Sequence, residues 1–568
     1  MKIKHFFGLA VIAAMTASCS SNEDLGTAGP GTGTNETGVG YATFTINLPS
    51  TNGTRAAGDP GFDAGDAKEY DVNDATLLIF KEAGASENEY TFVESVNLGS
   101  MVPWKDPSET GVTTHAKITA KLNKVNTKDK FYALVLLNNG TESNKKVDLP
   151  ADNQPFSVWN EAKANVTDKI ANTANGFYMA NAPLYKDNKV TTLVPIESTK
   201  IYPTEAQAAS NPSTDIYVER GLAKVTVTSA SSAPKTIADG TYKDDKVTIQ
   251  NWGLDVTNKK SFPVHKTDGT GYEDIWSNKA TPIGTNNATT LRFVDNTTTV
   301  AKRVYWGVDP NYNNAKLNAE TTEGKKERTD NFNYVGKDKL KATTSDAQYC
   351  LENTFNLDNM MQGQTTRVVF KAKYVPKGFT EGATFYMVGK NTAIWTEDNL
   401  KKEIVAAVTK VVTSATTSNT NVDLANAKND ITKAGNHLLA LSNISVTGVT
   451  LDQPKIDAIN EKLGLKEGEG ISTYQDAEAY YIAHVKHFGV LTPWKAGQSY
   501  GTDNLSFLGR YGVLRNNWYE LTVDKVSGPG YPDVPEVKPN VPDDENSKYI
   551  SVSVKILSWA KRSDTVDL

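Results

Sequence analysis

The sequence has 568 residues, of which 38% are hydrophobic and 22% charged, and its formal net charge is -6. These values describe a globular chain with room for two to four domains of roughly 100–200 residues each, and they exclude a wholly disordered chain. A mildly acidic chain lacks the basic surface that attracts phosphate backbones, so we expect no nucleic-acid partner. Only Cys19 and Cys350 are present, and an intrachain disulfide is not expected.

The chain begins with an export signal. Two lysines precede an apolar stretch from Phe6 to Met15, and small residues lead directly to Cys19. This order is typical of a secretory signal peptide, and the stretch is shorter than the roughly 20 residues of a membrane span. We expect residues 1–19 to be a lipoprotein signal with Cys19 lipidated, and the precursor to reach the outer membrane. A plain signal peptide with an incidental cysteine is the alternative.

A first strand is predicted after a tether rich in Gly and Thr. Residues 41–49 alternate, with Phe44, Ile46 and Leu48 on one face. The loop that follows is small and polar, with Arg55 in its middle. Such an exposed loop invites proteolysis at Arg55.

The body of the chain is predicted to be all-β. Short β-branched or aromatic runs are separated by turn residues, at 75–80, 116–122, 131–137, 222–229, 247–252, 367–374, 384–388, 479–485 and 519–523. Helical periodicity is convincing only in 396–412, where Leu400, Ile404, Val405 and Val408 form an apolar stripe, and in 453–465. We expect these helices to be insertions in a β domain. A domain boundary is expected near 210–214.

The C-terminus combines an arm with a strand. Residues 527–546 are rich in proline and acidic side chains, which predicts an extended, stiff arm. The following residues alternate, and one face carries Ile550, Val552, Val554 and Ile556.

The two end segments share a pattern, because each opens with Tyr and then alternates polar and apolar residues. They can therefore occupy the same kind of groove. If a cut after Arg55 releases the first strand, the terminal strand of another subunit can replace it, and repetition of this exchange builds a filament. The alternative is that both strands pair within their own subunit.

The sequence resembles the Bacteroidales fimbrillins, specifically the Mfa-type major subunit of type V pili. The segments that carry this resemblance are Cys19 with its preceding small residues, the loop 52–59, the stretches 218–225 and 513–519, and the end of the chain at 554–559 and 565–568.

The resemblance implies two transthyretin-like β-sandwich domains in tandem, with helical insertions in the second and a C-terminal donor-strand arm. The implied divisions are a signal peptide (1–19), a propeptide (20–55), an N-terminal domain (56–214), a C-terminal domain (215–526) and the arm with its donor strand (527–568). An arginine-specific, trypsin-like protease would cut between Arg55 and Ala56. The removable strand would carry Phe44, Ile46 and Leu48, and the donor strand Ile550, Val552, Val554 and Ile556.

The implied function is that of a pilus shaft subunit that supports adhesion and biofilm formation. Its expected partners are other copies of itself in a head-to-tail polymer, anchor and tip subunits, and host or bacterial surface receptors. The expected location is the outer membrane for the lipidated precursor and then the fimbria on the cell surface. No counterpart is found for the insertion around 409–436.

No enzyme, cofactor or metal is predicted. Hydrolase, zinc-protease, P-loop and dinucleotide motifs are missing from the sequence. His484 and His487, three apart in a strand, would face opposite sides, and the acidic turn at 268–274 lacks the EF-hand spacing. The alternative function is a monomeric, lipid-anchored adhesin or glycan-binding lipoprotein that uses loop tryptophans, with Trp104, Trp276, Trp306 and Trp494 as candidates.

Overall fold

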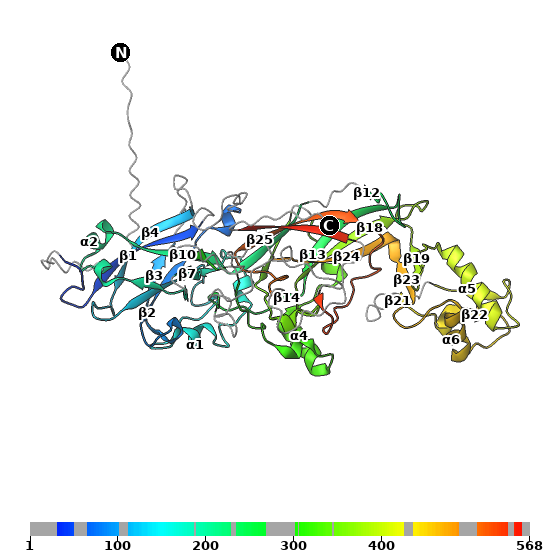
Figure 1. Cartoon of the computed structure of the whole chain (residues 1–568), viewed down its shortest axis with the longest axis horizontal. Helices are drawn as coiled ribbons and strands as arrows, with labels where there is room; N and C mark the ends of the chain where they lie inside the picture. Colours follow the sequence, from blue (N-terminus) through cyan, green and yellow to red (C-terminus); the bar gives the residue numbers. More distant parts are fainter. Residues whose placement is uncertain are drawn as a thin grey trace, which may run out of the picture.

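The structure is a computed structural model that describes residues 31–49, 65–100, 112–186, 189–228, 234–267, 302–304, 306–343, 346–424, 436–487, 508–543 and 550–558. These residues form mostly β-sheet with a few helices, which confirms the all-β prediction. Figure 1 shows an N-terminal sheet at one end, two sheets in the middle and a helical extension at the other end.

The N-terminal sheet curls around its own core. Its order is β3-β2-β5-β6-β10-β1-β4, with β9 beside β5. The ends of the sheet approach each other, because Glu94 of β3 accepts hydrogen bonds from the backbone of Asn123 and Lys124 just after β4. The strands are β1 (Gly40–Pro49), β2 (Ala75–Lys81), β3 (Thr91–Gly99), β4 (Val112–Leu122), β5 (Phe131–Leu137), β6 (Met179–Asn181), β9 (Val194–Ile196) and β10 (Thr214–Arg220).

Two four-stranded sheets form a sandwich in the middle of the molecule. Their orders are β17-β11-β25-β26 and β12-β13-β18-β24. One apolar cluster joins them, with Val225 and Leu521 from the first sheet and Phe370 and Tyr481 from the second. The strands are β11 (Leu222–Val227), β12 (Lys235–Thr236), β13 (Lys246–Asp255), β17 (Ala347–Leu351), β18 (Arg367–Val375), β24 (Glu478–His484), β25 (Asn517–Val526) and β26 (Ile550–Ser558).

The predicted helical insertion has a core of its own. Thr396 caps α5 by accepting a hydrogen bond from the Asn399 backbone. The buried stripe of α5 includes Leu400, Ile404 and Val408, as predicted, and packs with Ile456 of α6. The elements are α5 (Glu397–Val411), α6 (Gln453–Lys462), β19 (Phe385–Val388), β20 (Thr420–Val422), β21 (Asn436–His437), β22 (Ile444–Val446) and β23 (Ile471–Tyr474).

In the part of the chain that the structure describes, three further α-helices were not expected from the sequence. The helix α4 (Thr322–Asn331) has almost no apolar side chains, so it shows no stripe, but Thr321 caps it by accepting from the Gly324 backbone at 3.1 Å. The helices α1 (Phe156–Asn160) and α2 (Glu205–Ser210) are too short to show a period. Small sheets complete the fold: β7 (Leu184–Lys186) with β8 (Lys189–Thr191) and β15 (Lys302–Arg303), and β14 (Thr257–Asn258) with β16 (Phe332–Asn333).

Within the described parts of the chain, no helix has both the length and the apolar character to cross a membrane.

The chain passes from the first sheet to the sandwich at Gly221. This glycine separates β10 from β11, and its backbone N–H donates to Tyr178 O at 2.8 Å. A Cβ atom at this position would lie 2.9 Å from Cγ2 of Ile170, so only glycine fits here without a shift. The domain division at 214/215 stays a prediction.

The first part of the Pro-rich arm lies against the sandwich. The backbones of Tyr531 and Tyr480 exchange two hydrogen bonds of 2.8 Å, and Gln362 N donates to Val541 O at 2.9 Å. The carboxylate of Asp543 is fully buried and accepts from Thr365 Oγ1 at 2.8 Å. The arm is therefore fixed to the body as far as Asp543.

Candidate functional site

The first strand lies inside the N-terminal sheet. β1 pairs antiparallel with β4 on one side, where Phe44 faces Ile118, and parallel with β10 on the other, where Phe44 faces Thr214. The side chains of Phe44, Ile46 and Leu48 are fully buried in the core. Burial of three such side chains contributes on the order of 5–9 kcal/mol before other terms are counted. Loss of β1 would therefore open a deep apolar gap between two ladder partners.

The predicted processing residues lie outside the described residues. Cys19, Arg55 and Ala56 belong to this group, so their lipidation and cleavage stay predictions. The position of β1 relative to them is informative, because the strand ends at Pro49 and the described chain resumes at Gly65. A cut at Arg55 would remove the only covalent link between β1 and the rest of the body.

The terminal strand pairs with its own chain in this structure. β26 runs antiparallel to β25, with Ile556 opposite Tyr519, Val554 opposite Leu521 and Val552 opposite Val523. It stands last in its sheet order, and Figure 1 shows it in red along β25. This position agrees with pairing within one subunit before assembly, and it leaves the role of Ile550, Val552, Val554 and Ile556 as donor residues a prediction.

Two segments singled out in the sequence, 218–225 and 513–519, meet where the N-terminal sheet passes into the sandwich. β11 pairs parallel with β25, so that Lys224 stands beside Trp518. The Asn516 backbone donates to Leu222 O at 2.7 Å, and the Lys224 ammonium lies 3.7 Å from the centre of the Trp518 ring.

A buried ion pair ties the short helix at residues 67–69 to this junction. Glu69, in the short helix η2 (Ala67–Glu69), is fully buried and lies 2.9 Å from the Lys224 ammonium. Its carboxylate also accepts from the Tyr349 hydroxyl, and its carbonyl accepts from Arg220 Nε at 2.6 Å. Sequence reasoning missed Glu69, because it stands 155 residues from Lys224. The cluster holds the segment that follows the predicted cut in place.

A second buried polar group lies nearby, around His265. The Nδ1 atom of His265 lies 2.8 Å from Glu219, and its Nε2 atom lies 3.2 Å from Trp306 O. The same group contains an ion pair between Arg515 and Glu352, whose atoms lie 3.4 Å apart. Trp306 is itself fully buried, so the suggestion that it is an exposed, ligand-binding loop residue is wrong. Trp104, Trp276, Trp494 and the acidic turn at 268–274 lie outside the described residues.

The remaining candidate reactive groups are buried. Burial raises the pKa of the Cys350 thiol to about 12, so this thiol is protonated at neutral pH. His484 and His487 are both buried, and His487 Nδ1 lies 2.9 Å from the Tyr519 hydroxyl. Among the described residues, no group of three His, Cys, Asp or Glu side chains is placed to hold a metal ion.

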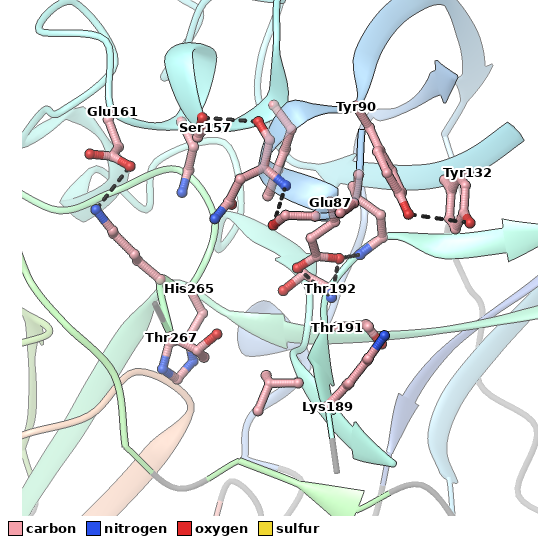
Figure 2. A pocket seen from close by; sticks show the side chains of 18 of the residues that line it. Glu87, Tyr90, Tyr132, Ser157, Glu161, Lys189, Thr191, Thr192, His265 and Thr267 are labelled. Carbon is pink, nitrogen blue, oxygen red and sulfur yellow. Dashed lines mark hydrogen bonds and ion pairs between the residues drawn. The ribbon is translucent and has the colours of Figure 1, made fainter. Parts of the chain in front are cut away.

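A cavity of about 580 Å³ opens beside the N-terminal sheet, between α1, β8 and residues 265–267. Figure 2 shows Tyr90 and Tyr132 on one side of it, Ser157 and Glu161 on another, and Lys189 and Thr191 at its edge. Nothing in the sequence pattern predicted it, because its walls come from five separate stretches of chain.

Comparison with known proteins adds a family match. Residues 472–565 match the family described as "Major fimbrial subunit protein type IV, Fimbrillin, C-terminal". None of the curated proteins compared with the chain matches it.

Solved structures give weak likenesses. A fimbrilin from Porphyromonas gingivalis is 12% identical over 92% of this chain and 99% of its own, with a TM-score of 0.34. The tip fimbrial protein Mfa3 from the same organism, with a C-terminal truncation, is 10% identical over 91% of this chain and 100% of its own, with a TM-score of 0.28. A fimbrial assembly protein from Parabacteroides distasonis is 13% identical over 47% of this chain and 78% of its own, with a TM-score of 0.23.

Proposed function

We propose that the chain is the shaft subunit of a pilus, with a structural role at the cell surface, and the match of residues 472–565 to the fimbrillin C-terminal family supports this. In this proposal the precursor is lipidated at Cys19 and held at the outer membrane. Cleavage between Arg55 and Ala56 by an arginine-specific protease then frees the subunit, and subunits join head to tail by exchange of strands. The finished fimbria supports adhesion and biofilm formation.

The position of β1 is the observation that carries this proposal. It lies between β4 and β10, with its apolar side chains fully buried, and the predicted cut falls after it. A cleaved subunit that loses β1 has two unpaired ladders around an apolar gap, a state that is costly until another strand enters. β26 has the alternation and the length to enter, with nine residues against the ten of β1.

The arm supports the exchange as well. It is fixed to the sandwich up to Asp543, and β26 begins at Ile550. The six residues between them reach about 20 Å when extended. β26 can therefore leave β25 while the rest of the arm stays in place.

The proposal is tested by digestion of the precursor without residues 1–19 with an arginine-specific protease, followed by unboiled denaturing gels and N-terminal sequencing. We expect a ladder of polymers whose subunits begin at Ala56. A cleaved product that stays monomeric would contradict a self-assembling shaft subunit and favour a tip, an anchor or a monomeric glycan-binding lipoprotein.

Two variants control for the site of the cut. Arg55→Ala and the charge-conserving Arg55→Lys should both resist the arginine-specific protease and stay monomeric. Normal ladders from Arg55→Lys would show that the relevant cut lies elsewhere.

A further inference from the structure

The geometry points to a carbohydrate-binding site in the cavity beside the N-terminal sheet, which would take a neutral pyranose unit of a surface glycan. The site is independent of strand exchange, because all of its lining residues belong to one chain and none of them lies in β1 or β26.

The cavity has the size and rigidity of a ligand site. Its volume of about 580 Å³ falls in the range of roughly 300–1,000 Å³ that is usual for small-molecule pockets. The wall that contains Lys266 is fastened to α1, because Asn160 Oδ1 accepts from Val264 N at 2.8 Å and Asn160 Nδ2 donates to Val264 O at 3.2 Å. Lys266 also pairs with Glu161 at 2.9 Å. The cavity therefore exists before any ligand arrives.

The charges of the lining balance, which favours an uncharged ligand. The lining contains two carboxylates, Glu87 and Glu161, and two amines, Lys189 and Lys266. Glu161 is paired with Lys266, and Glu87 accepts from the backbone of Thr192 at 2.9 Å. A charged ligand would meet no excess of the opposite charge.

An aromatic wall faces a polar one, as a sugar ring requires. The rings of Tyr90 and Tyr132 lie 4.5 Å apart between centres and are both partly exposed. The C–H face of a pyranose packs on such a ring, while its hydroxyls reach polar side chains around it. Thr191, Thr267 and Lys189 provide hydroxyls and an amine at the rim (Figure 2).

The tyrosine hydroxyls are oriented to receive a sugar hydroxyl. Tyr90 donates to Tyr132 at 3.5 Å, and Tyr132 donates to Glu82 Oε2 at 2.7 Å. Burial, followed by the bond to Tyr90, raises the pKa of Tyr132 well above its ordinary value, so this donor stays protonated. The Tyr90 oxygen, having given its proton to this chain, is an acceptor for the ligand.

Ligand-observed saturation-transfer NMR on the monomeric precursor without residues 1–19 tests the site. The probes are the methyl pyranosides of glucose, galactose, mannose and N-acetylglucosamine. We expect at least one probe to bind, and Thr191→Trp, which fills the rim from an exposed position, to reduce its binding at least tenfold. The matched control Thr199→Trp, also exposed but outside the cavity, should bind as the parent does.

A second variant separates stacking from steric blockage. Tyr90→Leu keeps an apolar side chain but removes the ring and its oxygen, and we expect it to weaken binding at least fivefold. Tyr334→Leu, at an exposed tyrosine in the loop after β16, is its control. Absence of binding by all four probes, or equal binding by the parent and Thr191→Trp, would overturn the site. Because the monomer is used, neither result depends on whether the chain polymerises.

Discussion

The two end strands of this chain occupy opposite kinds of position. β1 has a ladder on each side and a fully buried apolar face, whereas β26, among the described strands, pairs only with β25 and stands last in its sheet order. Removal of a central strand opens a gap that must be filled, while departure of the last strand shortens the sheet without dividing it. Although both strands have the same alternating pattern, removal of β1 would leave a gap in a sheet, and β26 can leave its own sheet to fill such a gap.

A charged side chain placed in each strand tests this difference between β1 and β26, and it should have the largest effect. Ile46→Asp puts a carboxylate into the buried core, and we expect it to lower the stability of the precursor by more than about 4 kcal/mol. Val552→Asp, at the position opposite Val523, should leave the precursor folded but stop polymer growth after cleavage. Urea unfolding and ladder gels measure the two effects, and equal destabilisation by both changes would contradict the contrast.

The ion pair between Glu69 and Lys224 should stabilise the part of the molecule that remains after β1 leaves. Lys224→Met leaves the Glu69 carboxylate buried without its cation, and we expect a loss of about 3–5 kcal/mol in the free energy of unfolding. The double variant Glu69→Gln with Lys224→Met should recover part of this loss. Lys68→Met, at an exposed lysine next to Glu69, is the control and should be neutral within about 0.5 kcal/mol.

A substitution in the arm that precedes β26 should have a smaller effect on the free energy of unfolding. Asp543→Ala removes the buried partner of Thr365 and should cost about 1–3 kcal/mol. Hydrogen exchange at 528–543 should then rise, whereas the exposed neighbour change Asp358→Ala should leave it unaltered. Unchanged exchange in Asp543→Ala would show that other contacts fix the arm.

Acid should weaken the sandwich that holds β26. Burial, with help from Arg367 and Lys486, lowers the pKa of His484 to about 3, from about 6.5 when unfolded. Between these two pH values, His484 is protonated in the unfolded chain but not in the folded chain. The free energy of unfolding is therefore highest above pH 6.5, and it falls as the pH drops towards 3. The expected slope is about 1.4 kcal/mol per pH unit. His484→Gln should reduce this slope in urea unfolding between pH 6.5 and 5, and an unchanged slope would contradict it.

Much of the fold could be predicted from local pattern. Alternation located β1, β4, β5, β18 and β26 to within a few residues, and the stripe with Leu400 and Ile404 located α5. The helix α4 was missed because its residues are nearly all polar, and capping by Thr321 is too weak a signal alone.

The site depends on contacts that local pattern does not encode. Nothing near Glu69 in sequence indicates that Lys224 is its partner, and nothing near Tyr90 indicates that Lys266 stands across the same cavity. Such pairings arise from how the sheets meet. The segments 218–225 and 513–519 were noted from the sequence, but their adjacency through β11 and β25 came from the structure.

The passage at Gly221 has a mechanical consequence. β10 flanks the position of β1, β11 flanks β25, and one glycine joins them. In a filament built by strand exchange, tension that enters through the strand beside β10 would pass along one continuous backbone into β11, and from there across the hydrogen bonds of the β11–β25 ladder. The pull would run along the strands and load many hydrogen bonds in shear at once, so stretching should meet resistance before the sheets themselves unfold.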